Sequence, residues 1–196
     1  MKSNSRSKTL LVTLFALSLL ATGCSAQWIK VALADLPVLL QMALNIGTLV
    51  TTLQSGQQLS SSEAREIQNI SNEASRDLNL LQTLYNEYEA SPSPNTIQKI
   101  QNAIADINQN LPTLLQAAQV SDPVLSARIA AAVNLILATV NSFATLIPQS
   151  AAAQKAAGKA TEVPHAPDLK KQWNQQVCGP TGKAMLDSAF APCALK

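Results

Sequence analysis

The segment PNTIQKIQNAIADINQNLPTLLQAAQ, residues 94–119, decides the fold class of this chain. Its apolar residues recur at alternating steps of three and four, which places them on one side of an α-helix. They are Ile97, Ile100, Ile104, Ile107, Leu111, Leu114 and Ala118. A helix with one continuous apolar side has to bury that side against a partner. The segment therefore predicts a helix that belongs to a bundle.

The preceding segment, residues 61–89, has the same helical period. Its apolar side consists of Ile67, Ile70, Ala74, Leu78, Leu81, Tyr85 and Tyr88. Ser60 stands directly before it and Glu63 follows three residues later, which is the pattern of a capping box. Between the two helices the sequence SPSPN predicts a break, with Ser93 as the N-cap of the next helix and a proline in its first turn.

The first apolar segment, residues 28–54, is amphipathic as well. Its polar stripe consists of Lys30, Gln41, Asn45, Thr48 and Thr52. Pro37 leaves two interpretations, because proline is tolerated in the first turn of a helix but bends a helix interior. Either the helix starts near Asp35, whose carboxylate caps it, or an earlier helix from Trp28 bends at the proline. We expect the start near Asp35.

A fourth segment follows the sequence SDP at residues 121–123 and is predicted to run to about Gln154. It is long enough to span a bilayer, but its residues divide between two sides. The apolar side consists of Leu125, Ile129, Ala132, Ile136, Val140, Phe143 and Ile147. The other side consists of Ala127, Ala131, Asn134, Ala138, Asn141 and Thr145. Because a lipid-embedded helix needs no such division, we expect a core helix.

Four helices joined by short turns indicate an all-α fold, an antiparallel up-down-up-down four-helix bundle with a short disulfide-closed C-terminal tail. We assign the helical bundle to residues 35–154. Residues 155–196 are expected to form a linker, a short helix and a disulfide loop. In that short helix, DLKKQWNQQV, Trp173 is expected to pack back onto the bundle, whereas His165 in VPHAP is expected to be exposed.

The N-terminus has the layout of a secretory signal peptide: three basic residues within the first eight positions precede the apolar run LLVTLFALSLL. That run is about half of the ~20 residues that a membrane-spanning helix needs. Ala21, Thr22 and Gly23 stand directly before Cys24, and this resembles the lipobox of bacterial prolipoproteins. The resemblance implies a diacylglycerol on the Cys24 thiol, cleavage directly before it, and acylation of the new amino group, typically with palmitate.

The resemblance covers only residues 1–24, of which 1–23 would be the signal peptide. It implies membrane attachment through the N-terminal lipid. Because Ser25 stands where an aspartate would signal inner-membrane retention, it further implies the periplasmic face of the outer membrane of a Gram-negative bacterium. We expect residues 24–34 to form a tether. The alternative is ordinary cleavage after Ala26, which would leave a freely soluble protein.

Cys178 and Cys193 remain once Cys24 is assigned to the lipid, and an even number of cysteines in an oxidising compartment predicts a disulfide. Closing a loop of this length contributes on the order of 3 kcal/mol in the chain-entropy model. A metal site is disfavoured, because no other cysteine or histidine lies close to either residue in sequence.

The formal net charge of the whole sequence is +2. Removing residues 1–23 leaves 11 basic and 12 acidic residues, a net charge of about −1. With 4% aromatic residues in addition, the chain lacks the basic surface and stacking platforms of nucleic-acid-binding proteins. GPTGK, residues 179–183, is similar to the end of a phosphate-binding loop, but Val177 and Ala184 replace its first glycine and its hydroxyl residue. We therefore expect neither nucleic-acid nor nucleotide binding.

Enzymatic chemistry is not indicated, because a chain with a single histidine lacks the usual base for a serine or cysteine nucleophile. We expect no cofactor and no metal. The acidic residues Glu66, Glu73 and Asp77 form a candidate partner-binding face. The expected function is a lipid-anchored, non-enzymatic scaffold or binding module for another envelope protein. The alternative is a membrane-inserting or pore-forming helical protein in which residues 36–54 and 124–147 enter the bilayer.

Overall fold

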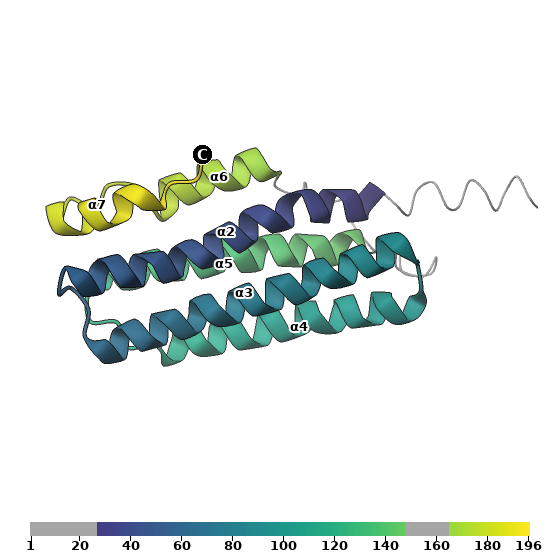
Figure 1. The fold of residues 1–196 in the computed structure, drawn as a ribbon, viewed down its shortest axis with the longest axis horizontal. Coiled ribbons are helices and arrows are strands. Elements are labelled where there is room, and N and C mark those ends of the chain that lie inside the picture. Colours follow the sequence, from purple (N-terminus) through teal and green to yellow (C-terminus); the bar gives the residue numbers. More distant parts are fainter. Residues whose placement is uncertain (1–26, 148–164) are drawn as a thin grey trace, which may run out of the picture.

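The computed structural model describes residues 27–147 and 165–196, and these ranges contain helices and turns but no strand (Figure 1). Its elements are α2 (Gln27–Ser55), α3 (Ser61–Ala90), α4 (Pro94–Ala117), α5 (Pro123–Leu146), α6 (Ala166–Gln176), α7 (Ala184–Phe190) and the 3₁₀ helix η1 (Ala191–Cys193). The predicted all-α class is confirmed. The predictions about cleavage and lipid attachment at Cys24, and those about residues 148–164, lie outside the described residues.

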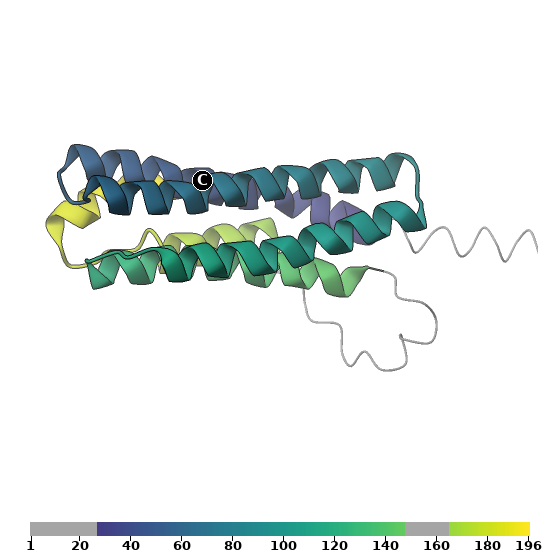
Figure 2. The same cartoon turned by 90° about the horizontal axis from the view of Figure 1, so that it is seen from below.

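The four long helices enclose one core: α2 packs on α3, α3 on α4, α4 on α5, and α5 on α2. Short connections join successive helices at alternating ends (Figure 1). Seen from below, α2 lies beside α3 and α4 beside α5 (Figure 2). The segment formed by residues 165–196, named the C-terminal arm here, contacts α2 and α5 through α6, and α2 through α7 and η1.

The predicted starts of α3, α4 and α5 are confirmed at the level of single hydrogen bonds. The Glu63 N–H donates to the Ser60 hydroxyl while the Glu63 carboxylate accepts from the Ser60 N–H, which completes the capping box. The Ser93 hydroxyl accepts from the Thr96 N–H over 3.1 Å at the start of α4. Asp122 caps α5. These caps satisfy N–H groups that a helix leaves without an intrahelical partner.

The predicted division of α5 into two sides is confirmed. Every residue of its predicted apolar side is at most 3% exposed, namely Leu125, Ile129, Ala132, Ile136, Val140, Phe143 and Ile147. Asn134 and Asn141 are exposed on the other side. The Asn108 side chain on α4 donates to the Asn141 amide oxygen over 2.7 Å. The most apolar helix of the predicted bundle is therefore packed as a core helix.

The first helix begins earlier than the sequence indicated. We predicted a tether over residues 24–34 and a helix start near Asp35, but α2 begins at Gln27, so the described part of the tether is helical and that prediction is wrong. The physical reason is burial: Trp28 is 7% exposed and packs edge-on against Tyr85, with 5.6 Å between ring centroids. Burying aromatic surface of this size outweighs the cost of a proline inside a helix.

Pro37 lies inside α2, on its exposed side. Asp35 is consequently not an N-cap but a buried residue of a helix interior, and it is 2% exposed. At the same end of the bundle α5 ends at Leu146, and the predicted continuation to Gln154 lies outside the described residues. The C-cap Ile147 has extended backbone angles, as expected of a residue before a proline.

Candidate functional site

The acidic residues at the start of α3 bind main-chain groups of the α4–α5 connection. Glu63 accepts from the Ser121 N–H and Glu66 from the Gln119 N–H, each over 2.7 Å. Hydrogen bonds from Ser60 and Ser121 lower the pKa of Glu63 to about 2. These carboxylates therefore stabilise the junction of three helices.

The two other residues of the predicted acidic face are also engaged within the bundle. Glu73 pairs with Arg76 and accepts from the Asn110 side chain of α4 over 3.1 Å. Asp77 is 7% exposed, and its Oδ1 accepts from Arg76 Nε over 3.3 Å. Glu66, Glu73 and Asp77 thus lie along α3 with intramolecular partners, and their role toward another protein stays a prediction.

A denser set of polar contacts lies along the seam between α2 and the C-terminal arm. The arm is positioned by Leu169, Trp173 and Val177, which recur at steps of four along α6 and are 0% exposed. Because residues four apart share one side of a helix, α6 presents a single apolar ridge to α2 and α5. The prediction that Trp173 packs back onto the bundle is confirmed.

The Cys193 carbonyl is the central acceptor of this seam. It receives hydrogen bonds from Asn45 Nδ2 of α2 over 3.0 Å and from Trp173 Nε1 of α6 over 2.9 Å. The predicted disulfide is present and joins Cys193 to Cys178. The disulfide fixes the chain after α6 to the end of η1. The Cys193 carbonyl of η1 is hydrogen-bonded to both α2 and α6, so it joins the arm to the bundle.

The other end of the arm is bound to the first turns of α5. The Arg128 guanidinium donates to the carbonyl oxygens of Gln176 and Pro180. Lys183 Nζ lies 2.6 Å from Asp122 Oδ2, and this ammonium is the main cause that lowers the pKa of Asp122. The lysine of the GPTGK sequence is therefore an anchor of the arm on the N-cap of α5.

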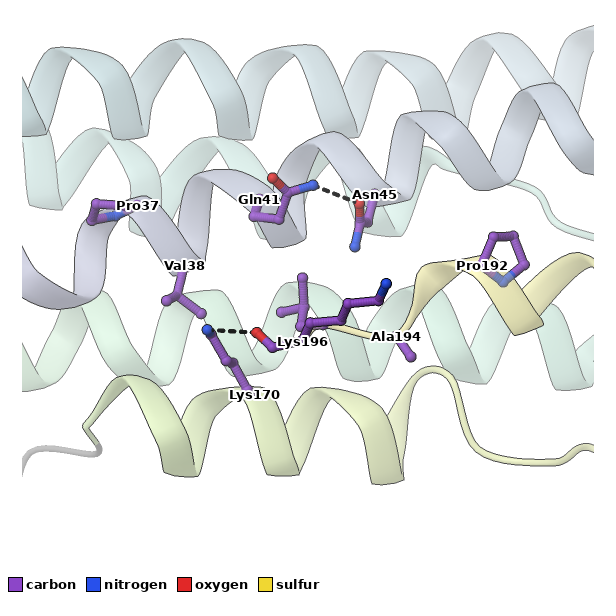
Figure 3. A pocket seen from close by; sticks show the side chains of 9 residues that line it. Pro37, Val38, Gln41, Asn45, Lys170, Pro192, Ala194 and Lys196 are labelled. Atoms are coloured by element: carbon purple, nitrogen blue, oxygen red, sulfur yellow. Dashed lines mark hydrogen bonds between the residues drawn. The ribbon is translucent and has the colours of Figure 1, made fainter.

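A hollow of about 440 Å³ opens between α2 and the end of the arm (Figure 3). Val38 and Leu195 contribute apolar walls, and Gln41 donates to Asn45 Oδ1 over 3.0 Å along the rim. Lys170 also lines the hollow, and its Nζ donates to the main-chain oxygen of Lys196 over 2.7 Å. The lining holds two lysines and two amides, and it holds no aspartate or glutamate. Its chemistry suits a carboxylate or a carbonyl-bearing group.

A buried carboxyl lies where the arm begins. Among the described residues Asp35 Oδ2 has no hydrogen-bond partner, and the Ala166 N–H, at the first residue of α6, lies close enough to the Asp35 carboxyl to affect its pKa. Burial raises the pKa of Asp35, and the Ala166 N–H and the charge of His165 oppose this shift. The expected exposure of His165 is confirmed. Sequence reasoning missed this contact, because nothing local connects residues so far apart in the chain.

Within residues 27–147 and 165–196, no three histidine, cysteine, aspartate or glutamate side chains lie together as metal ligands would. Two helical stretches, Trp28–Ser55 and Pro123–Leu146, are long and apolar enough to cross a membrane, and half of each apolar window is buried within the bundle.

Comparison with known proteins finds no match to a family model, to a curated protein or to a solved structure.

Proposed function

We propose that this chain is a lipid-anchored, non-enzymatic binding module of the bacterial cell envelope, an up-down-up-down four-helix bundle attached through Cys24 to the periplasmic face of the outer membrane. The lipobox resemblance at residues 21–24 supports the anchor. The observation that carries the proposal is the packing of α5, whose apolar side is buried in the bundle. A helix that fills a protein core does not have that side available for lipid.

The seam between α2 and the C-terminal arm is the surface that best suits a partner. Its hollow combines the ammonium groups of Lys170 and Lys196 with the amides of Gln41 and Asn45, next to apolar walls. Such a site suits an acidic segment of another envelope protein, since carboxylates accept charge-assisted hydrogen bonds from ammonium groups. Gln41 and Lys196 are exposed, which also leaves room for water-mediated contacts.

Site-specific photo-crosslinking in intact cells tests this assignment. A photoreactive residue at Gln41, on the rim of the hollow, is expected to give a defined adduct, and Lys170→Glu in the same chain is expected to abolish it. A photoreactive residue in place of Glu66 tests the acidic side of α3. The same substitution at the exposed Ala105 of α4 serves as the control. Adducts at Glu66 and not at Gln41 would indicate that the partner binds the acidic face of α3 and not the hollow.

The intact mass of the protein purified from membranes tests the anchor. We expect the mass of a chain that begins at Cys24 and carries a diacylglycerol and an acyl chain. A mass that corresponds to an unmodified chain beginning at Gln27 would contradict lipid attachment and indicate a freely soluble secreted protein.

Membrane insertion is the competing function, favoured by the length and hydropathy of α2 and α5. Two alanines of α5 separate the alternatives: Ala138 is exposed in the bundle, and Ala132 is 0% exposed. In membranes from cells that express each cysteine variant, a water-soluble maleimide should label Ala138→Cys and leave Ala132→Cys unlabelled. Protection of both positions until detergent is added would favour insertion.

A further inference from the structure

The main chain of residues 193–196 is held by side chains of two helices. The Cys193 carbonyl accepts from one side chain of α2 and one of α6. Farther along, the Asn174 side chain of α6 makes two hydrogen bonds to Leu195. Its Nδ2 donates to the Leu195 carbonyl over 2.9 Å, and its Oδ1 accepts from the Leu195 N–H over 2.7 Å. The segment is therefore bound mainly through its peptide groups.

Residues 194–196, named the resident segment here, are held as a bound peptide would be. They form no helix or turn, and Ala194 has extended backbone angles. The Leu195 side chain packs against the core, whereas Ala194 and Lys196 are exposed. In peptide recognition of this kind, main-chain hydrogen bonds give affinity and pockets for alternate side chains give specificity. The groove between α2 and α6 thus has the chemistry to bind an extended peptide.

The resident segment also occupies the cation that an acidic ligand would use. Lys170 Nζ donates to the main-chain oxygen of Lys196, and the hollow lies between α2 and this segment (Figure 3). No described residue that lines the hollow is acidic. A carboxylate would accept a stronger, charge-assisted hydrogen bond from the same ammonium. The segment and an acidic ligand therefore compete for Lys170.

We propose that the groove between α2 and α6 binds an extended, acidic peptide segment of the partner, and that the resident segment competes with it within the same chain. This inference rests on the proposed function of the hollow, and it adds the conformation of the ligand and its competitor. The partner's peptide groups bind Asn174, an apolar side chain takes the place of Leu195, and a carboxylate binds Lys170.

The exchange leaves the fold intact, because the arm is anchored elsewhere. Leu169, Trp173 and Val177 of α6 are 0% exposed, and the disulfide joins the end of η1 to the chain after α6. Release of the resident segment breaks the hydrogen bonds of Asn174 and Lys170, and the incoming peptide remakes them. The affinity for the peptide is lowered by the fraction of molecules in which the segment is bound.

NMR titration of the full chain with the peptide acetyl-APSALE-amide tests the competition. This peptide is the sequence of residues 191–196 with serine in place of Cys193 and glutamate in place of Lys196. Leu195→Pro removes the N–H that donates to Asn174, so it weakens the resident segment and leaves the side chains of the groove unchanged. Loss of one hydrogen bond should raise the affinity for the peptide about two- to tenfold.

Ala184→Pro is the matched control, because it places the same new residue elsewhere in the arm. Ala184 is exposed and is the first residue of α7, a position that tolerates proline. This variant should bind the peptide with wild-type affinity. In the wild type, saturating peptide should shift the Asn174 side-chain signals and lower the hydrogen-exchange protection of the Leu195 N–H, because the resident segment is displaced.

The competition is overturned if Leu195→Pro does not bind the peptide more tightly than the wild type. It is also overturned if the wild type is saturated while the Leu195 N–H stays protected. Should Leu195→Pro fail to fold, Leu195→Ala decides: it keeps the main-chain hydrogen bonds and shortens only the apolar contact, and it should raise the affinity as well.

The peptide acetyl-APSALQ-amide separates this inference from the proposed function. Its glutamine carries no charge, so it should bind Leu195→Pro about three- to tenfold more weakly than the glutamate peptide does. Equal affinity of the two peptides would contradict an acidic ligand, and with it the proposed function of the hollow. Equal affinity of the wild type and Leu195→Pro for the glutamate peptide, with the charge preference intact, overturns the competition alone.

Discussion

Two hydrogen bonds to the Cys193 carbonyl lead us to expect that two substitutions have non-additive effects on the free energy of unfolding. Asn45 of α2 and Trp173 of α6 both donate to this oxygen, over 3.0 and 2.9 Å, and Cys193 is 3% exposed. After Asn45→Ala or Trp173→Phe alone, the carbonyl keeps one donor. After both, it is buried without a protein partner. The double variant should therefore lose more stability than the sum of the two single variants.

The magnitude follows from the two different costs. Losing one hydrogen bond of a shared acceptor costs about 0.5–1.5 kcal/mol, whereas leaving a buried acceptor unsatisfied costs about 1–3 kcal/mol. The coupling free energy is the difference between these two costs, so we expect about 0.5–1.5 kcal/mol beyond additivity. The packing loss of Trp173→Phe occurs in both the single and the double variant, so the thermodynamic cycle cancels it.

Urea unfolding of the four proteins, monitored by circular dichroism, measures the cycle. Thr48→Ala provides the control in place of Asn45→Ala: Thr48 is exposed on the same helix, and its hydroxyl donates to the Leu44 carbonyl of its own helix. Combined with Trp173→Phe it should be additive within about 0.5 kcal/mol. Additivity of the Asn45 and Trp173 pair would refute the reasoning that one carbonyl couples α2 to the arm.

Three further predictions concern other contacts. Gly47→Ala should destabilise the protein although alanine favours helix, because the added Cβ would lie 2.7 Å from Ser71 Oγ. Ser71→Ala in the same chain should relieve this clash. The melting temperatures of the single and the double variant measure both effects. Reducing the bond between Cys178 and Cys193 should lower the free energy of unfolding by roughly 3 kcal/mol, measured in urea with and without reductant. The pKa of Glu63 is about 2 in the folded state against an ordinary 4.5, so its contribution to the free energy of unfolding is present above pH 4.5 and is lost as the pH falls toward 2. Glu63→Gln should therefore reduce the loss of stability over this pH range, measured as the free energy of unfolding against pH.

The helices and their buried sides were largely predictable, because their signals are local. The capping box of Ser60 and Glu63 is encoded within four residues, and the structure confirms both of its hydrogen bonds. The apolar side of α5 follows from periodicity alone. The burial of Tyr85 and of Trp173, both 0% exposed, was likewise predicted from the helical positions of these residues.

The start of α2 and the seam were not predictable, because both depend on residues distant in sequence. Pro37 and Asp35 together matched the start of a helix, and only the packing of Trp28 against the end of α3 shows that the helix extends further. The acidic residues of α3 were predicted to form a partner-binding face, but Glu66 accepts a hydrogen bond from the Gln119 N–H of a connection 53 positions away. Hydrogen bonds of this range leave no periodic pattern in the sequence.

The hydrogen bond between Asn45 and Cys193 also bears on the order in which the chain folds, since it joins residues 148 positions apart. By contrast, Ser71 of α3 reaches the Ala43 carbonyl of α2 across 28 positions. Contacts between neighbouring helices close short loops and form early, whereas those of the arm require most of the chain to be in place. The groove between α2 and α5 is formed by helices that both precede Trp173 in the chain, so it can assemble before α6 docks. The four helices therefore pass through a stage with an uncovered apolar groove, and that stage is when the chain is most exposed to aggregation.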